Sequence, residues 1–166
     1  KPVSIVVLTV SDTRTEKNDK SGDTLVERIK KAGHHLVEKR IVKDDLSLLK
    51  DTLKEWIDSV SVDVVIATGG TGVTGRDVTP EAFESLYEKS IPGFGELFRW
   101  LSYQNIKTST IQSRATAGVA NGTFLFALPG STGACKDAWD MIIVHQLNST
   151  HKPCNLVELM PRLMEK

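Results

Sequence analysis

The chain has 166 residues and a mass of 18.3 kDa, and its 21 basic and 21 acidic side chains cancel to a formal net charge of zero. This length, with 40% hydrophobic residues, predicts a single domain over residues 1–166 with a buried core of its own. The balanced charge argues against a general nucleic-acid or membrane binder, so we expect a small ligand that is held locally.

The sequence gives no sign of secretion or membrane insertion. The longest apolar runs have the length of strands, so we expect neither a signal peptide nor a membrane span, and a cytoplasmic location follows. Cys135 and Cys154 are too few for a disulfide framework and lack metal-ligand spacing, which predicts two free thiols. The four histidines have no partners at metal-ligand spacing, so we expect them to be solvated.

Strands and helices alternate in the first half of the chain. A continuous run rich in β-forming residues at positions 3–10 predicts a buried strand, and two further strands are expected at residues 35–42 and 62–67. Between them, Ser21 precedes one helix and Ser47 opens a second. The apolar residues expected on the inner faces of these helices are Leu25, Ile29, Ala32, Leu49, Leu53, Trp56, Ile57 and Val60. This order of elements predicts an α/β fold in which helices cover a parallel sheet.

The second half of the chain adds three helices and one strand. Thr79 fits the capping position of a helix with Pro80 at its first position, and that helix is expected to end before Pro92. The elements expected after it are a helix marked by Phe94, Leu97, Phe98 and Leu101, a strand at residues 123–128, a helix at residues 134–147 with Ala138, Met141 and Ile142 inward, and an irregular, exposed tail after His151.

Polar residues follow every one of these strands, at the edge where open α/β sheets bind their ligands. The glycine-rich run at residues 68–77 allows backbone N–H groups to point at phosphate oxygens. Asp12, Asp44 and Asp77 follow the first, second and third strands, and their carboxylates suit a magnesium ion that bridges such oxygens. The pattern predicts phosphoryl or nucleotidyl transfer, in which positioning and charge neutralisation supply most of the rate acceleration.

Two formal nucleotide-binding motifs fit the glycine-rich run only in part. Residues 70–75 match G-x-G-x-x-G, but the next helix starts only near Thr79 and no strand ending in an acid follows, so NAD binding is disfavoured. The Walker pattern fails because Arg76 and Asp77 follow the last glycine of the run. ATP hydrolysis of the P-loop kind is therefore not expected.

Several of the singled-out side chains also suit purely structural roles. Each aspartate taken alone fits a turn or a helix cap. Ser113 and Arg114 fit either a loop contact or an anion-binding site. Phe94, Phe98 and Trp100 fit either the core or an exposed stripe that another subunit covers.

A resemblance to a known family carries the interpretation further. The sequence contains, in this order, LTVSDTR, SGDTL, TGGTGVTGRDVTPEA, PGFGELFRWLS, SRATAGVANGTFLFALPGS and CKDAW. Together these segments resemble the MoaB/Mog family of molybdenum cofactor biosynthesis proteins, and its MoaB branch most closely. The resemblance implies a three-layer α/β sandwich with a mostly parallel sheet flanked by helices, assembled as a trimer or a dimer of trimers. It also implies binding of molybdopterin, an anionic pterin dithiolene phosphate, and contact with other proteins of the pathway.

The activity implied by the resemblance is molybdopterin adenylylation. Such an enzyme uses Mg²⁺ and ATP to attach AMP to the terminal phosphate of molybdopterin and releases pyrophosphate. Matched motif by motif, Asp44 and Asp77 become the catalytic acids that bind Mg²⁺. The residues implied to bind the substrates are Ser11, Asp12, Gly69, Gly70, Thr71, Gly72, Thr79, Pro80, Glu81, Ser113, Arg114, Pro129, Gly130 and Ser131.

One alternative follows from the same resemblance. Some MoaB-type proteins have lost the acid of the RDVTPE motif and do not adenylylate, whereas this chain keeps both Asp44 and Asp77. We therefore expect an active adenylyltransferase, and the alternative is a non-catalytic protein that binds, carries or scaffolds molybdopterin in the same pathway. Lys43 stands where Mog-type enzymes usually have proline. This difference bears on the rate of adenylylation more than on the identity of the ligand. A protein that binds some other nucleotide is the third hypothesis.

Overall fold

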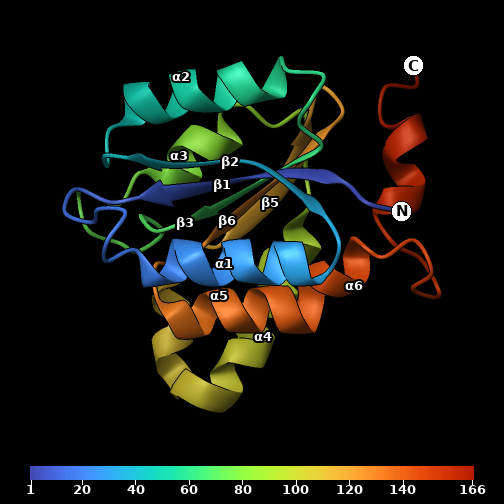
Figure 1. Cartoon of the computed structure of the whole chain (residues 1–166). Helices are drawn as coiled ribbons and strands as arrows, with labels where there is room; N and C mark the ends of the chain where they lie inside the picture. The colour runs from blue at the N-terminus through green and yellow to red at the C-terminus, as the bar shows by residue number, and fades with distance from the viewer.

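A six-stranded sheet in the order β2-β1-β3-β6-β5-β4 forms the centre of the molecule, as the computed structural model of residues 1–166 shows (Figure 1). The strands are β1 (Ser4–Val10), β2 (His35–Val42), β3 (Val64–Thr68), β4 (Lys89–Ser90), β5 (Thr116–Ala120) and β6 (Thr123–Leu128). β2, β1, β3 and β6 run parallel to one another, while β5 is antiparallel to both of its neighbours. The mostly parallel sheet predicted from the sequence is therefore confirmed.

Helices cover both faces of this sheet. They are α1 (Lys20–Lys31), α2 (Leu46–Ile57), α3 (Thr79–Glu84), α4 (Pro92–Ile106), α5 (Thr132–Ala138), α6 (Val144–Gln146), the 3₁₀ helices η1 (Lys107–Gln112) and η3 (Val157–Arg162), and a π turn (Trp139–Ile143) that joins α5 to α6. None of them combines the length and hydropathy that a bilayer crossing requires. In Figure 1, α2 and α3 lie above the sheet, and α1, α4 and α5 lie below it, which gives three layers.

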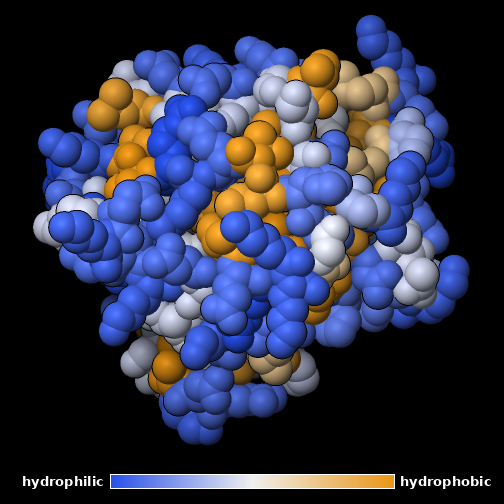
Figure 2. Space-filling view, viewed as in Figure 1, coloured by the Kyte–Doolittle hydropathy of each residue, from blue (hydrophilic) through white to orange (hydrophobic).

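The alternation of side chains along the strands divides the core into two halves. On β1, Ile5 and Val7 point toward α1, α4 and α5, whereas Val6 and Leu8 point toward α2 and α3. The central strands are apolar on both sides because each face is covered by helices. The face seen in Figure 2 is mostly hydrophilic, with hydrophobic areas between the hydrophilic side chains, one of them near the centre of the view.

The strand order places three strand ends together. Because β1 lies between β2 and β3, the chain moves outward from β1 in both directions, and the crevice at such a reversal is where open α/β sheets bind ligands. Thr9 is opposite Thr68, and Thr68 is opposite Leu128, so β1, β3 and β6 end at nearly the same level. The loops that follow these strands therefore meet.

Two strands and three helix starts differ from the sequence-based expectation. β4 and β5 were not predicted, because β4 has two residues and β5 (TAGVA) is built from small side chains. The caps of α1 and α2 are Asp19 and Asp45, whose carboxylates accept backbone N–H bonds, rather than Ser21 and Ser47. Thr79 is the first residue of α3 and not its cap, because its hydroxyl donates to the Gly69 carbonyl instead.

Several expected inward and outward positions are also corrected. Val60 lies beyond the end of α2 and is fully exposed, and Met141 is 45% exposed because the π turn alters the helical phase there. The chain after His151 is not wholly irregular and exposed, since Val157 begins η3 and is buried against the core. Phe94 and Phe98 belong to the core, which decides between the two roles left open for them.

A buried carboxylate connects β1, α1 and β2 next to the meeting point of the loops. Asp19 is fully buried and accepts hydrogen bonds from Thr9 Oγ1 at 2.6 Å and from the Gly22 N–H at 3.0 Å, and it pairs with Lys39 at 3.0 Å. Burial by itself raises the pKa of Asp19, but the hydrogen bonds from Thr9 and Gly22 and the Lys39 charge outweigh it, so the pKa lies below its usual value.

We predict that Asp19→Asn destabilises the fold by about 3 kcal/mol, because the variant breaks a buried charge pair. Urea unfolding measures this loss of free energy. The folded-state pKa of Asp19 is depressed, so its contribution is present above the unfolded-state pKa of about 3.9 and is lost as pH falls through the folded-state pKa. The variant should therefore lose less stability than the wild type on acidification.

The matched control is Asp23→Asn. Asp23 contacts the same Lys39 at 2.9 Å, but its side chain is 63% exposed, so the change should cost less than about 1 kcal/mol. Equal losses of unfolding free energy in the two variants would show that the burial of Asp19 adds no stability beyond its charge pair with Lys39.

Candidate functional site

The glycine loop, residues 68–77, crosses the ends of β1 and β6 at a distance that only glycine permits. At Gly69, φ is +105°, and a Cβ built there would lie 2.2 Å from the Val10 carbonyl oxygen. The Gly69 N–H donates to the Leu128 carbonyl at 3.0 Å. Gly70 has φ of +70°, and a Cβ there would lie 2.3 Å from Thr79 Oγ1. Both glycines are therefore required by close backbone approach as well as by conformation.

The start of α3 fixes the outward course of the loop. Thr79 is fully buried, its hydroxyl donates to the Gly69 carbonyl at 2.8 Å, and its N–H donates to the Gly70 carbonyl at 3.1 Å. These bonds use two of the loop's carbonyl groups. No hydrogen bond within the chain uses the N–H groups of Gly70, Thr71 and Gly72, which is the arrangement expected of an anion-binding backbone.

Arg114 holds the far side of the glycine loop. Its guanidinium donates to the carbonyl oxygens of Gly72 at 2.8 Å and Asp77 at 2.9 Å, and it forms an ion pair with Glu81. The hydrogen bond from Arg114 keeps the pKa of Glu81 below its usual value. Arg114 therefore contacts the loop, and Glu81 is its ion-pair partner. Both side chains also line, with Asp77, a separate hollow on the surface.

Two of the three predicted aspartates differ sharply in their surroundings. Asp12 forms a two-pronged ion pair with Arg76 at 2.9–3.0 Å and accepts the N–H of Asp44 at 3.1 Å. The hydrogen bond from Arg76 lowers the pKa of Asp12. In contrast, burial raises the pKa of Asp44, the carboxylates of Asp12 and Asp77 raise it further, and Arg76 opposes them. Asp44 therefore lies within electrostatic reach of both other acids.

Asp77 is oriented by its own turn. Its Oδ2 accepts the N–H of Thr74 at 3.0 Å and the Thr74 hydroxyl at 2.8 Å. A Cβ at Gly72 would lie 2.7 Å from the same oxygen, so the glycine lets the carboxylate approach the loop backbone. On the other side of the loop, a Cβ at Gly70 would lie 3.0 Å from Asp44 Oδ1. The two acids thus flank the free amides.

The three aspartates do not form a ready-made metal cage. No group of three or more His, Cys, Asp or Glu side chains lies close enough together to hold an ion, and Asp12 is occupied by Arg76. Asp44 and Asp77 remain as a pair. This fits Mg²⁺, which commonly uses one or two protein carboxylates and completes its coordination with water and substrate phosphates.

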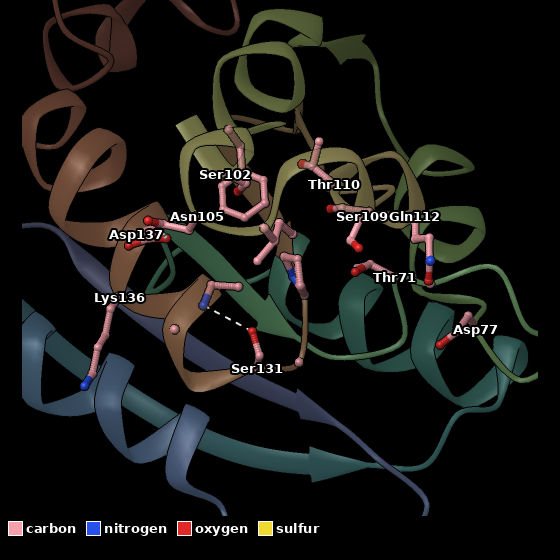
Figure 3. Close-up of a pocket in the computed structure, with 18 of the residues that line it drawn as sticks. Thr71, Asp77, Ser102, Asn105, Ser109, Thr110, Gln112, Ser131, Lys136 and Asp137 are labelled. Atoms are coloured by element: carbon pink, nitrogen blue, oxygen red, sulfur yellow. Dashed lines mark hydrogen bonds between the residues drawn. The ribbon is translucent and has the colours of Figure 1, made fainter. Parts of the chain in front are cut away.

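A cavity of about 720 Å³ opens beside the glycine loop (Figure 3). The predicted site residues that line it are Gly70, Thr71, Gly72, Asp77, Ser113, Pro129, Gly130 and Ser131. The N–H groups of Gly130 and Ser131 have no partner in the chain either, so both loops present free donors to the same space. The volume suits a drug-sized or nucleotide-sized ligand.

The other predicted site residues lie outside this cavity. They are Ser11, Asp12, Asp44, Gly69, Thr79, Pro80, Glu81 and Arg114. Ser11 accepts the N–H groups of Thr13 and Arg14, so its hydroxyl stabilises a turn. Pro80 is buried behind the loop in α3. Most of this group therefore supports the loops rather than facing the ligand space.

The far wall of the cavity was not predicted from the sequence. It consists of Phe98, Ser102, Asn105 and Ile106 from α4, Ser109, Thr110 and Gln112 from η1, and Gly133, Ala134, Lys136 and Asp137 from α5. The available signal was the polar run at residues 102–113, which is unusual for a segment that follows a core helix. Its approach to the cavity depends on tertiary packing, since Arg99 holds the carbonyls of Ser113 and Ala115.

Comparisons with known proteins agree with this geometry. Residues 6–149 match a family model described as a probable molybdopterin binding domain. The chain is 50% identical over 154 residues to molybdenum cofactor biosynthesis protein B of Escherichia coli K12, covering 93% of this chain and 91% of the relative, and 46% identical over 142 residues to the protein of that name from Bacillus subtilis, covering 85% and 84%.

Solved structures with the same architecture are similar over most of their length. A crystal structure of molybdenum cofactor biosynthesis protein B superimposes with a TM-score of 0.86 at 44% identity and covers 89% of this chain and 92% of that one. The tungsten cofactor synthesizing protein MoaB from Pyrococcus furiosus superimposes with a TM-score of 0.78 at 41% identity, covering 86% and 91%.

We predict that Gly70→Ala lowers the free energy of unfolding by about 2 kcal/mol, because position 70 has a left-handed φ and a new Cβ would collide with Thr79. Gly75→Ala is the matched control in the same loop, since a Cβ there meets nothing within 4 Å. That variant should stay within about 0.5 kcal/mol of the wild type. Urea unfolding measures both, and a fully stable Gly70→Ala variant would refute the steric account of the loop.

Proposed function

Because the chain belongs to the molybdopterin-binding family of molybdenum cofactor biosynthesis proteins, we propose that it transfers AMP from ATP to molybdopterin. The terminal phosphate oxygen of molybdopterin bonds to the α-phosphorus of ATP, the bond from that phosphorus to the β-phosphate oxygen breaks, and pyrophosphate leaves. The observation that carries the proposal is the pair Asp44 and Asp77 on either side of free loop amides.

The backbone supplies the phosphate contacts in this proposal. The free N–H groups of Gly70, Thr71 and Gly72 border the same cavity as those of Gly130 and Ser131, so phosphate oxygens have donors from two loops. Phosphoryl-transfer reactions need little covalent help from a protein and depend on positioning and charge stabilisation. A loop fixed by Thr79 and Arg114 provides such positioning because its donors do not have to reorganise.

The carboxylates supply the cation site. Asp44 and Asp77 would hold Mg²⁺ together with substrate phosphate oxygens, and the ion, when bound, neutralises phosphate charge. Thr74 keeps Asp77 oriented toward the loop, and Lys43 and Arg76 add positive charge at the edge of the site. Asp12 orients Arg76 and the Asp44 backbone, so its role is positioning.

Partners and location follow from the same family. We propose that the protein works in the cytoplasm with other molybdenum cofactor biosynthesis proteins and assembles as a homotrimer, alone or as a dimer of trimers. Phe94 and Phe98 cannot form an exposed stripe that another subunit covers, because both are in the core. The exposed apolar side chains of α4 are instead Leu97, Trp100, Tyr103 and Ile106.

We predict that Asp77→Asn abolishes pyrophosphate release from ATP and molybdopterin, by at least about 100-fold, while molybdopterin binding and folding persist. Asparagine still accepts the hydrogen bonds from Thr74, but it lacks the charge that a divalent ion requires. Asp51→Asn on α2, an exposed position with no hydrogen bond from its side chain, is the control and should keep full activity.

Three outcomes of this assay separate the hypotheses. Release by the wild type and by Asp51→Asn but not by Asp77→Asn supports adenylyl transfer. Full release by Asp77→Asn would refute the proposed metal role. Molybdopterin binding by the wild type without any pyrophosphate release would replace the enzyme with the non-catalytic carrier or scaffold.

We predict that Trp100→Glu dissociates the trimer, because the substitution places a charge in the exposed apolar face of α4, where Trp100 is 66% exposed. Light scattering coupled to size exclusion measures the mass in solution. Val60→Glu, at a fully exposed position after α2, is the control and should leave the mass unchanged. A monomeric wild type at micromolar concentration would refute the assembly itself.

A further inference from the structure

The cavity has two chemically different ends. One end carries the free amides of the glycine loop, Asp77, and the turn at Gly130 and Ser131, which suit phosphates. The other end lies between α4 and α5, where Phe98, Ile106 and Ala134 present apolar surface. A ligand with a flat ring at one end and a phosphate at the other matches this division.

One carboxylate lies at the ring end. Asp137 lines the cavity, is only partly exposed, and accepts a hydrogen bond from Asn105 Nδ2 at 3.2 Å. Figure 3 shows Asn105 and Asp137 side by side at the opposite end of the cavity from Thr71 and Asp77. Asp137 forms no ion pair, so its remaining acceptor positions are available to a ligand. Asn105 restrains the carboxylate from the facing helix.

We propose that Asp137, positioned by Asn105, is the specificity-determining residue that recognises the pterin ring by accepting its 2-amino and N3–H hydrogen bonds. The inference rests on the proposed function, because it takes molybdopterin as the ligand. The six residue steps from Ser131 to Asp137 span about 9 Å of helix, which leaves room for a fused ring between the phosphate donors and the carboxylate.

The donor pattern of the ring explains the choice of a carboxylate. A pterin presents two adjacent N–H donors along its amino-pyrimidine edge, and an ionised carboxylate has two acceptor oxygens in the matching geometry. The adenine edge presents an amino donor beside a ring-nitrogen acceptor, which an amide side chain matches and a carboxylate does not. Asp137 therefore selects the pterin for this end, and the adenine of ATP is excluded from it.

The position of the pterin also determines where the second substrate lies. With the pterin between α4 and α5, its phosphate reaches the glycine loop, and the nucleotide approaches from the side of Asp44 and Arg76. Asp44 borders Gly70 without lining the cavity, which places it next to the phosphates and away from the pterin ring.

The test compares two stable phosphate probes on the full chain. One is 6-(hydroxymethyl)pterin phosphate, and the other is the corresponding lumazine, in which an oxygen replaces the 2-amino group and faces the carboxylate unfavourably. We expect the wild type to bind the pterin about 10- to 100-fold more tightly, the range of one bidentate pair. Asp137→Asn should reduce this ratio to about 3-fold or less and raise KM for molybdopterin with little change in kcat.

Asp140→Asn provides the matched control in the helical turn that follows. Asp140 pairs with Arg28 at 2.9 Å on the surface and does not line the cavity, so its variant should keep the wild-type ratio. Asn105→Ala should give a ratio between those of wild type and Asp137→Asn, because it frees the carboxylate without removing it.

The outcomes separate this inference from the proposed function. Equal binding of the two probes by the wild type, or an unchanged ratio in Asp137→Asn, would overturn the inference even if pyrophosphate is released. A ratio that is lost in Asp137→Asn, reduced in Asn105→Ala and kept in Asp140→Asn would support the inference even if the wild type released no pyrophosphate. In that case only adenylyl transfer would be refuted.

Discussion

The close approach of the glycine loop to the end of β1 is the constraint on which the site depends. The Val10 carbonyl occupies the space where a side chain of residue 69 would begin, so the backbone of the loop lies directly over the sheet edge. Gly130, in the loop that follows β6, packs against Gly69, with a hypothetical Cβ only 3.3 Å from the Gly69 Cα. Two loops that are far apart in the sequence thereby present their free amides to one cavity. A larger residue at either glycine would separate them.

Some polar groups of the site are hydrogen-bonded within the chain and support the loops, whereas others have no partner in the chain. Arg114 and Thr79 use their hydrogen bonds on loop carbonyls, and Asp12 is paired with Arg76. The N–H groups of Gly70, Thr71 and Gly72 have no partner in the chain, and the proposed function assigns them, with Asp44 and Asp77, to a ligand and its ion. Residues that belong to one sequence motif therefore have different tasks, and substitution of the supporting group acts through loop position rather than through lost contacts with substrate.

Much of the fold was predictable because the central strands are buried runs of β-branched and aromatic residues. β5 was missed because a neighbouring side chain requires a small residue in it. A Cβ at Gly118 would lie 2.5 Å from the ring of Tyr87, so the strand has a glycine where β propensity would favour a larger residue. Met141 was misplaced because a π turn changes the helical phase. The glycine loop was found from its motif, whereas Asn105 and Asp137 reach the cavity only through packing of α4 against α5.

The most direct test of the central claim follows the adenylyl group itself. ATP labelled with phosphorus-32 at the α-phosphate would be incubated with the wild-type protein, Mg²⁺ and molybdopterin, and the products separated by chromatography. We expect the label to move to the pterin in an amount equal to the pyrophosphate formed, and we expect this product to require both Mg²⁺ and molybdopterin. Label that remains in ATP, or appears only as free AMP, would contradict adenylyl transfer.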